Sequence, residues 1–168
     1  MNKNQLVETL QDIDFLRDVS REHLEELATV ASLRDFNATE IVFREGEIAE
    51  QVYLVVSGNV SLEICAPGIG CKRILTVGPG EILGWSALLD QPRLTATART
   101  MTATQLVELD AAPLLAICEQ NLQFGYEFMR RTMLALTTRL SATRMQLLDV
   151  YGSQFPVTAH AGEEQDGR

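Results

Sequence analysis

The residues best suited to chemistry lie between Val77 and Ala98, where several glycines precede a short apolar helix. Gly84 stands directly before Trp85-Ser86-Ala87, and a β-branched run begins at Thr95. Glycine lets backbone N–H groups approach an anion closely, because no Cβ stands in the way. A helix N-terminus adds partial positive charge. The pattern predicts a phosphate-binding turn, although such glycines before a small helix more often form an ordinary turn.

No pattern typical of a catalytic centre accompanies this stretch. His23 lies among charged residues of a predicted helix and His160 in a polar terminal segment, so both are expected to be solvated. Cys65, Cys71 and Cys118 show no CxxC spacing, which predicts buried or incidental thiols in a reducing compartment and no metal site. The serines lack a nucleophile elbow. The sequence therefore predicts a protein that is not an enzyme.

Composition sets the broad class. A chain of 168 residues with 46% hydrophobic content can bury one core, so a single domain is expected. The formal net charge of -9 opposes attraction to nucleic acid or to anionic lipid. The N-terminal residues resemble no signal peptide, and no apolar run is long enough to span a membrane. We expect a cytoplasmic protein whose partners are small molecules or other proteins.

The hydrophobic period changes twice along the chain. Leucines at helical spacing predict a helix near the N-terminus, and Ser20 is a plausible N-cap for a second helix whose apolar stripe is Leu24, Leu27, Ala28 and Ala31. Strands are predicted at 41–43, 52–56, 60–64, 73–77, 94–98 and 105–109. Short strands at even spacing predict an antiparallel roll or barrel, with helices kept to the two ends of the chain.

The helical period returns at Asp110, which can cap a helix over 111–119, and Asn121 begins the longest helix, at about 121–151. An apolar seam follows at alternating spacings of four and three: Met129, Met133, Leu136, Leu140, Thr143, Leu147 and Val150. Such a heptad seam favours pairing with a second helix, here the same helix of a homodimer. The alternative is packing on the chain's own roll, and one helix can do both. Residues 153–168 are polar and predicted to be disordered.

The strand residues carry a specific resemblance. The runs Phe43-Arg44-Glu45-Gly46-Glu47, 52–60 and 78–84 closely resemble the cyclic nucleotide-binding domain family, to which bacterial catabolite activators belong. The similarity extends from Phe15 to Gly152, within a domain that we place at 1–152. The resemblance implies an α+β fold, in which an antiparallel β-roll is flanked by N-terminal helices and by a long C-terminal dimerisation helix.

The resemblance also implies a phosphate-binding cassette, which reads Phe-Gly-Glu, a variable loop, and then Arg, Ser or Thr, and Ala. Leu83 and Gly84 match its first positions, but Trp85 replaces the glutamate that accepts a hydrogen bond from the ribose. An indole donates and does not accept. Thr95-Ala96 matches the final pair, which places Leu94 at the arginine position.

Arg93 lies one residue before that arginine position, so it reaches a phosphate only if a shorter loop or a bulge turns it. Losing two charged hydrogen bonds costs roughly 3 to 6 kcal/mol. We therefore expect weak cyclic nucleotide binding or none, with Trp85 filling the space of the ligand rather than stacking on a base. The candidate ligand-binding residues are Gly84, Trp85, Ser86, Ala87, Arg93, Thr95, Ala96 and Thr138.

The last of these, Thr138, matches by ungapped counting a family hydroxyl that contacts the adenine, while Arg139 replaces the hydroxyl residue after it. Relatives that regulate transcription continue into a helix-turn-helix module, and no recognition helix can be built from the residues after Gly152. We expect no nucleic acid partner.

Three hypotheses follow. The first is a stand-alone dimeric regulatory module whose pocket is vacant or takes another small anion, and which acts through an unknown protein partner. The second is a genuine cyclic nucleotide receptor that uses Arg93. The third is a ligand-free structural dimer.

Overall fold

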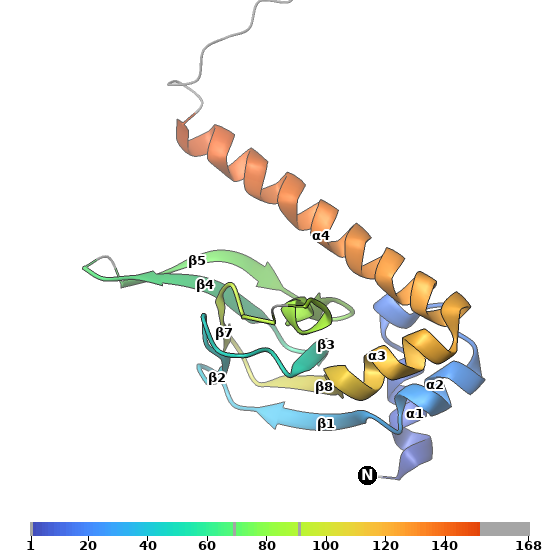
Figure 1. Ribbon diagram of the computed structural model, residues 1–168. Helices are drawn as coiled ribbons and strands as arrows, with labels where there is room; N and C mark the ends of the chain where they lie inside the picture. Colours follow the sequence, from blue (N-terminus) through green and yellow to red (C-terminus); the bar gives the residue numbers. More distant parts are fainter. Residues whose placement is uncertain (1, 69, 91, 152–168) are drawn as a thin grey trace, which may run out of the picture.

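The structure is a computed structural model that describes residues 2–68, 70–90 and 92–151 (Figure 1). Its helices are α1 (Lys3–Gln11), η1 (Asp14–Leu16), α2 (Arg21–Leu27), η2 (Trp85–Leu88), α3 (Ala111–Gln120) and α4 (Leu122–Tyr151). Its strands are β1 (Ala31–Phe36), β2 (Ile41–Phe43), β3 (Gln51–Ser57), β4 (Val60–Ala66), β5 (Gly70–Val77), β6 (Ile82–Leu83), β7 (Thr97–Thr100) and β8 (Thr104–Asp110). The α+β fold, with a long C-terminal helix, is confirmed.

The strands form two four-stranded antiparallel sheets within the described residues, in the orders β1-β8-β3-β6 and β2-β7-β4-β5. The core lies between them, and its fully buried members include Leu54, Leu83, Leu106 and Leu109. Helices α1, α2 and α3 gather at one end of this roll, and α4 runs back past it (Figure 1). The predicted roll, with helices at both ends of the chain, is therefore confirmed.

The N-terminal helices are as predicted, except for one residue that belongs to a strand. Ser20 caps α2 by accepting a hydrogen bond from the backbone N–H of His23, as predicted. Ala31, however, belongs to β1 and pairs with Leu109, so its assignment to the helix is wrong. Ala31–Phe36 is an edge strand that pairs with β8 along its whole length, and this pairing overrides the helical spacing of a single alanine.

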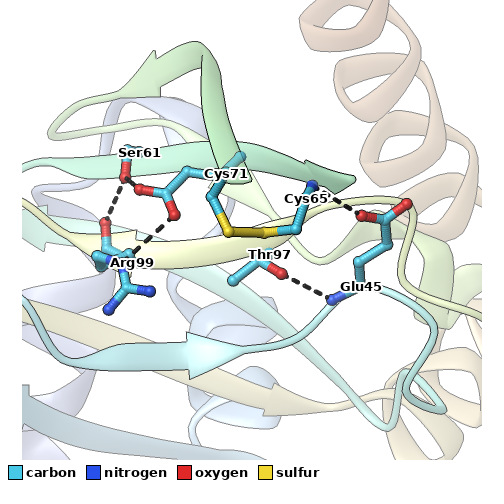
Figure 2. The surroundings of a disulfide bond; sticks show 7 residues. Glu45, Ser61, Cys65, Cys71, Thr97 and Arg99 are labelled. Carbon is cyan, nitrogen blue, oxygen red and sulfur yellow. Dashed lines mark hydrogen bonds and ion pairs between the residues drawn. A yellow bond between two sulfur atoms is a disulfide. The ribbon is translucent and has the colours of Figure 1, made fainter. Parts of the chain in front are cut away.

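The β4–β5 hairpin carries a disulfide that the cysteine spacing does not predict. Cys65 and Cys71 face each other in the β4–β5 register and form a disulfide (Figure 2). The prediction of free thiols is wrong for this pair, because cysteine spacing alone does not reveal a strand register. Cys118 is free and buried, and burial raises the pKa of its thiol to about 11.

The turn end of this hairpin is hydrogen-bonded to neighbouring segments. The backbone N–H of Cys65 donates to the Glu45 carboxylate, and the N–H of Glu45 donates to the Thr97 hydroxyl (Figure 2). These bonds connect β4 with the segment after β2 and with the start of β7. The disulfide therefore closes a hairpin that lies beside the strands leading to the candidate site.

Helix α4 is anchored to the rest of the fold by its first two turns. Phe128 packs edge-to-face on Phe15 with ring centroids 5.2 Å apart, and Phe124 lies 5.9 Å from Phe128. A Cβ on Gly125 would lie 2.5 Å from the carbonyl oxygen of Cys118, so the crossing of α3 and α4 requires glycine there. The position of α4 over the roll is therefore set near its N-terminus.

Near the start of α3 and α4, the structure differs from two expectations, one about a helix cap and one about the exposure of a histidine. Asp110 precedes α3 but makes no side-chain capping hydrogen bond, whereas Asn121 caps α4 by accepting from the N–H of Phe124. His23 is half-buried, with its Nε2 2.5 Å from the amide nitrogen of Asn121 and its ring 5.1 Å from that of Phe124. The expectation of a solvated His23 is wrong, because α4 begins over its ring.

Some predictions fall outside the described residues. The polar segment 153–168, the domain boundary at 152 and the side chain of Val150 lie there, as does His160. Among the described helices, none is both long enough and apolar enough to cross a lipid bilayer.

Candidate ligand-binding site

A half-open cavity of about 30 Å³ lies where the β6–η2 turn, the segment before β7 and helix α4 meet. Five of the predicted site residues line it, namely Gly84, Trp85, Ser86, Thr95 and Ala96. The other lining residues are Phe43, Leu62, Leu94 and Arg139. Residues far apart in the sequence therefore meet at the predicted cassette.

The turn that forms one wall depends on a glycine. Gly84 has a φ of 73°, and a Cβ there would lie 2.9 Å from the carbonyl oxygen of Gln51 and from the Tyr53 ring. The left-handed conformation and the close approach both exclude larger residues. Burial raises the pKa of Tyr53 to about 12, so the phenol whose ring lies beside this glycine stays neutral. The neighbouring Ala87 is buried and does not line the cavity.

The opposite wall lacks the expected arginine. The Arg93 guanidinium donates to the carbonyl oxygen of Gly46 at 2.9 Å and does not line the cavity. Leu94, which is 7% exposed, lines the cavity instead. Backbone bonds join Leu94 to Gly46 and Glu47, so the segment is fixed in the register that turns Arg93 away. No bulge of the kind considered for Arg93 brings it to the cavity.

Helix α4 contributes a different residue from the one predicted. The hydroxyl of Thr138 donates to the carbonyl oxygen of Leu134, and its exposed side chain does not line the cavity. Arg139 lines the cavity, and its Nη2 donates to the carbonyl oxygen of Ile82. Its Nη1 is buried and has no hydrogen-bond partner in the part of the chain that the structure describes.

Burial lowers the pKa of Arg139, and the nearby Glu81 carboxylate opposes that shift. An arginine nonetheless remains protonated at neutral pH. Among the described residues, no Asp or Glu lines the cavity. The wall therefore combines one cation with the indole N–H of Trp85 and the hydroxyls of Ser86 and Thr95, which is a donor-rich surface suited to an anion.

In the sequence, Arg139 is identified only as the replacement of a family hydroxyl, and no role is predicted for it. The signal that the sequence offered was the residue type. Arginine has a long cationic side chain, and this one lies on the predicted C-terminal helix that flanks the roll. What the sequence could not supply was the direction of the side chain relative to Ile82.

Comparisons with known proteins agree with this architecture. The chain is 28% identical over 123 residues to a CRP-like cAMP-activated global transcriptional regulator of Mycobacterium tuberculosis, in a match that covers 73% of this chain and 53% of that protein. The chain thus spans about half the length of that relative.

Solved structures are similar as well. A candidate cyclic nucleotide-binding protein from Geobacter metallireducens has a TM-score of 0.70 and 26% identity, over 79% of this chain and 96% of that one. The regulatory domain of Toxoplasma gondii PKA, solved with cAMP, has a TM-score of 0.59 and 27% identity, over 68% of this chain and 44% of that one. The family model of the cyclic nucleotide-binding domain matches residues 33–121, more than half of the sequence. This chain therefore belongs to the cyclic nucleotide-binding domain family.

Proposed function

We propose that this chain is a non-catalytic regulatory module whose divergent cassette does not hold a cyclic nucleotide in the way that the family resemblance implies. The observation that carries the proposal is the orientation of Arg93, which donates to Gly46 while Leu94 lines the cavity. An apolar side chain there offers no charge to a phosphodiester. Trp85 on the opposite side supplies no acceptor for a ribose hydroxyl.

The size of the cavity supports the same proposal. Pockets for drug-sized ligands measure roughly 300 to 1,000 Å³, about ten times or more the 30 Å³ found here. The two missing charged hydrogen bonds add a cost of roughly 3 to 6 kcal/mol, which corresponds to about two to four orders of magnitude in affinity. A cyclic mononucleotide is therefore expected to bind at millimolar concentration or not at all.

A thermal shift experiment tests this expectation. A site with a dissociation constant of about 10 μM would gain about 2.7 kcal/mol from a ligand at about 1 mM. For a domain of this size that gain raises Tm by roughly 5 to 10 °C. We expect no shift with cAMP, cGMP or cyclic dinucleotides at this concentration, with 5′-AMP as the matched control. A shift of that size with cAMP and not with 5′-AMP would favour the cyclic nucleotide receptor instead.

We also propose that the module is a homodimer through α4. The seam residues Met133, Leu140 and Leu147 are exposed large apolar side chains, and the exposed Tyr126 extends the same seven-residue spacing by one repeat. Met129, Leu136 and Thr143 are half-buried along the other row of the seam. A protein rarely leaves such a stripe in water, and a second copy of the same helix matches it by symmetry.

The dimer is tested by charge insertion. Leu136→Lys with Leu140→Lys places two ammonium groups per chain in the seam, and we expect light scattering to report the monomer mass. The matched control is Leu134→Lys with Leu148→Lys, because these leucines are 54% and 50% exposed on the same helix but lie outside the seam. The control should remain dimeric. An unchanged dimer mass in the seam variant would contradict this interface.

The signalling output is assigned to a protein partner, because the proposed module carries no catalytic group and its net charge of -9 opposes nucleic acid. A structural dimer without a ligand is the remaining alternative. It is favoured if no anion of any kind changes the environment of Trp85.

A further inference from the structure

The Arg139 guanidinium has a buried nitrogen for which the described residues supply no acceptor. It comes from the middle of α4 and lines the cassette cavity. Only one of its terminal nitrogens is satisfied, through the carbonyl oxygen of Ile82, while Nη1 is buried without an acceptor among the described residues. A buried charged donor without an acceptor is unfavourable, because it has lost its water without gaining a partner. Such a cost is retained where the group has a ligand to bind.

The residues around Arg139 indicate that a ligand in the cavity is negatively charged. No Asp or Glu among the described residues lines the cavity, although the Glu81 carboxylate lies near enough to Arg139 to oppose the lowering of its pKa. The remaining polar groups on the wall are the Trp85 indole, which only donates, and the hydroxyls of Ser86 and Thr95, which can donate. Donors around one cation match the oxygens of a carboxylate or a phosphate, which accept bidentate bonds from arginine.

We propose that the cavity binds a small oxyanion through Arg139, which supplies from α4 the positive charge that Leu94 fails to supply from the roll. This inference rests on the proposed function and adds a ligand class to it. The cavity volume of about 30 Å³ is too small for a nucleotide and leaves room only for a small group. Because the cavity is half-open, part of the anion stays in solvent beside the exposed Thr95.

Because Arg139 lies on α4, a ligand in the cavity also affects the helix that forms the proposed dimer. Arg139 precedes the seam residue Leu140, so one turn of α4 both contacts the cavity and carries the proposed dimer surface. An anion that draws the guanidinium away from Ile82 exchanges a contact between α4 and β6 for a contact with the ligand. Occupancy of the cavity therefore changes how α4 is held against the roll.

Trp85 makes the proposal directly measurable, because it is the only tryptophan of the chain and it lines the cavity. The full chain is titrated with inorganic phosphate and, separately, with propionate, each to about 10 mM at constant ionic strength in a buffer free of other oxyanions. We expect a saturable change in tryptophan emission with at least one of them. The two arms distinguish a phosphate ligand from a carboxylate ligand.

Three variants identify the responsible residue. Arg139→Gln should weaken the response by about tenfold or more, whereas Arg139→Lys should keep part of it because the charge remains. Arg93→Gln is the matched control and should respond as the parent does, since that guanidinium lies outside the cavity. Circular dichroism confirms that each variant is folded.

Different results would overturn the anion site and the proposed function. No saturable response of the parent to either anion, or equal responses of the parent and Arg139→Gln, would overturn the anion site and leave a cavity filled by water only. A micromolar response to cAMP in the same assay would overturn the proposed function, whatever phosphate does.

Discussion

Replacing Trp85 by glutamate, Leu94 by arginine and Arg139 by serine together is expected to raise the affinity for cAMP by about two to four orders of magnitude. The first two changes restore the acceptor and the cation that the cassette lacks. The third removes a guanidinium that lines the same cavity and would pair with the new carboxylate. Isothermal titration calorimetry on the variant and the parent measures the gain.

The control separates charge from space. Trp85→Gln, Leu94→Met and Arg139→Ser change the side-chain volumes in a similar way but add neither charge, so this variant should bind cAMP no better than the parent. Leu94 is almost fully buried, and an arginine there lowers the free energy of unfolding until the ligand neutralises it. Equal affinities for the charged and the neutral variants would show that the cassette differences do not explain the binding.

The second large effect concerns the anchor of α4. Phe128→Ala should lower the free energy of unfolding by about 3 to 5 kcal/mol, because Phe128 is 1% exposed and packs against both Phe15 and Phe124. Urea denaturation followed by circular dichroism measures the change. The matched control is Leu122→Ala on the same helix, where the side chain is 76% exposed and the expected loss is about 0.5 kcal/mol or less.

A loss below about 1 kcal/mol for Phe128→Ala would mean that α4 is not held by this aromatic cluster. In that case, contacts other than this aromatic cluster would have to hold Arg139 at the cavity.

Much of the fold could be predicted because its signals are local. The N-cap at Ser20, most of the predicted strands and the apolar turn after Gly84 each depend on a few neighbouring residues, and the structure has them as expected. The bounds of the strand predicted at 94–98 are wrong, because β7 spans Thr97–Thr100 and the residues before it are held by backbone bonds of Leu94 to Gly46 and Glu47. The two-residue β6 and the edge strand β1 were missed, since neither has a strong period of its own. Both are stabilised by pairing with distant strands, β6 with β3 and β1 with β8.

The site could be predicted only in part, because some of its residues are positioned by contacts between distant parts of the sequence. The residues of the turn and of the segment before β7 were found, because they lie close together in the sequence. Arg139 and the Cys65–Cys71 disulfide depend on long-range register, which sequence spacing does not encode. The direction of Arg93 is likewise set by backbone bonds to the loop at Gly46 and Glu47 and not by its immediate neighbours.

The central claim is that this cassette lacks the groups that hold a cyclic phosphodiester. Isothermal titration calorimetry of the unmodified chain with cAMP tests it most directly. We expect no measurable heat of binding, or a dissociation constant of about 1 mM or weaker. A dissociation constant in the micromolar range that is lost in Arg93→Gln would contradict the account, because it would show that Arg93 turns into the cavity and binds the phosphate.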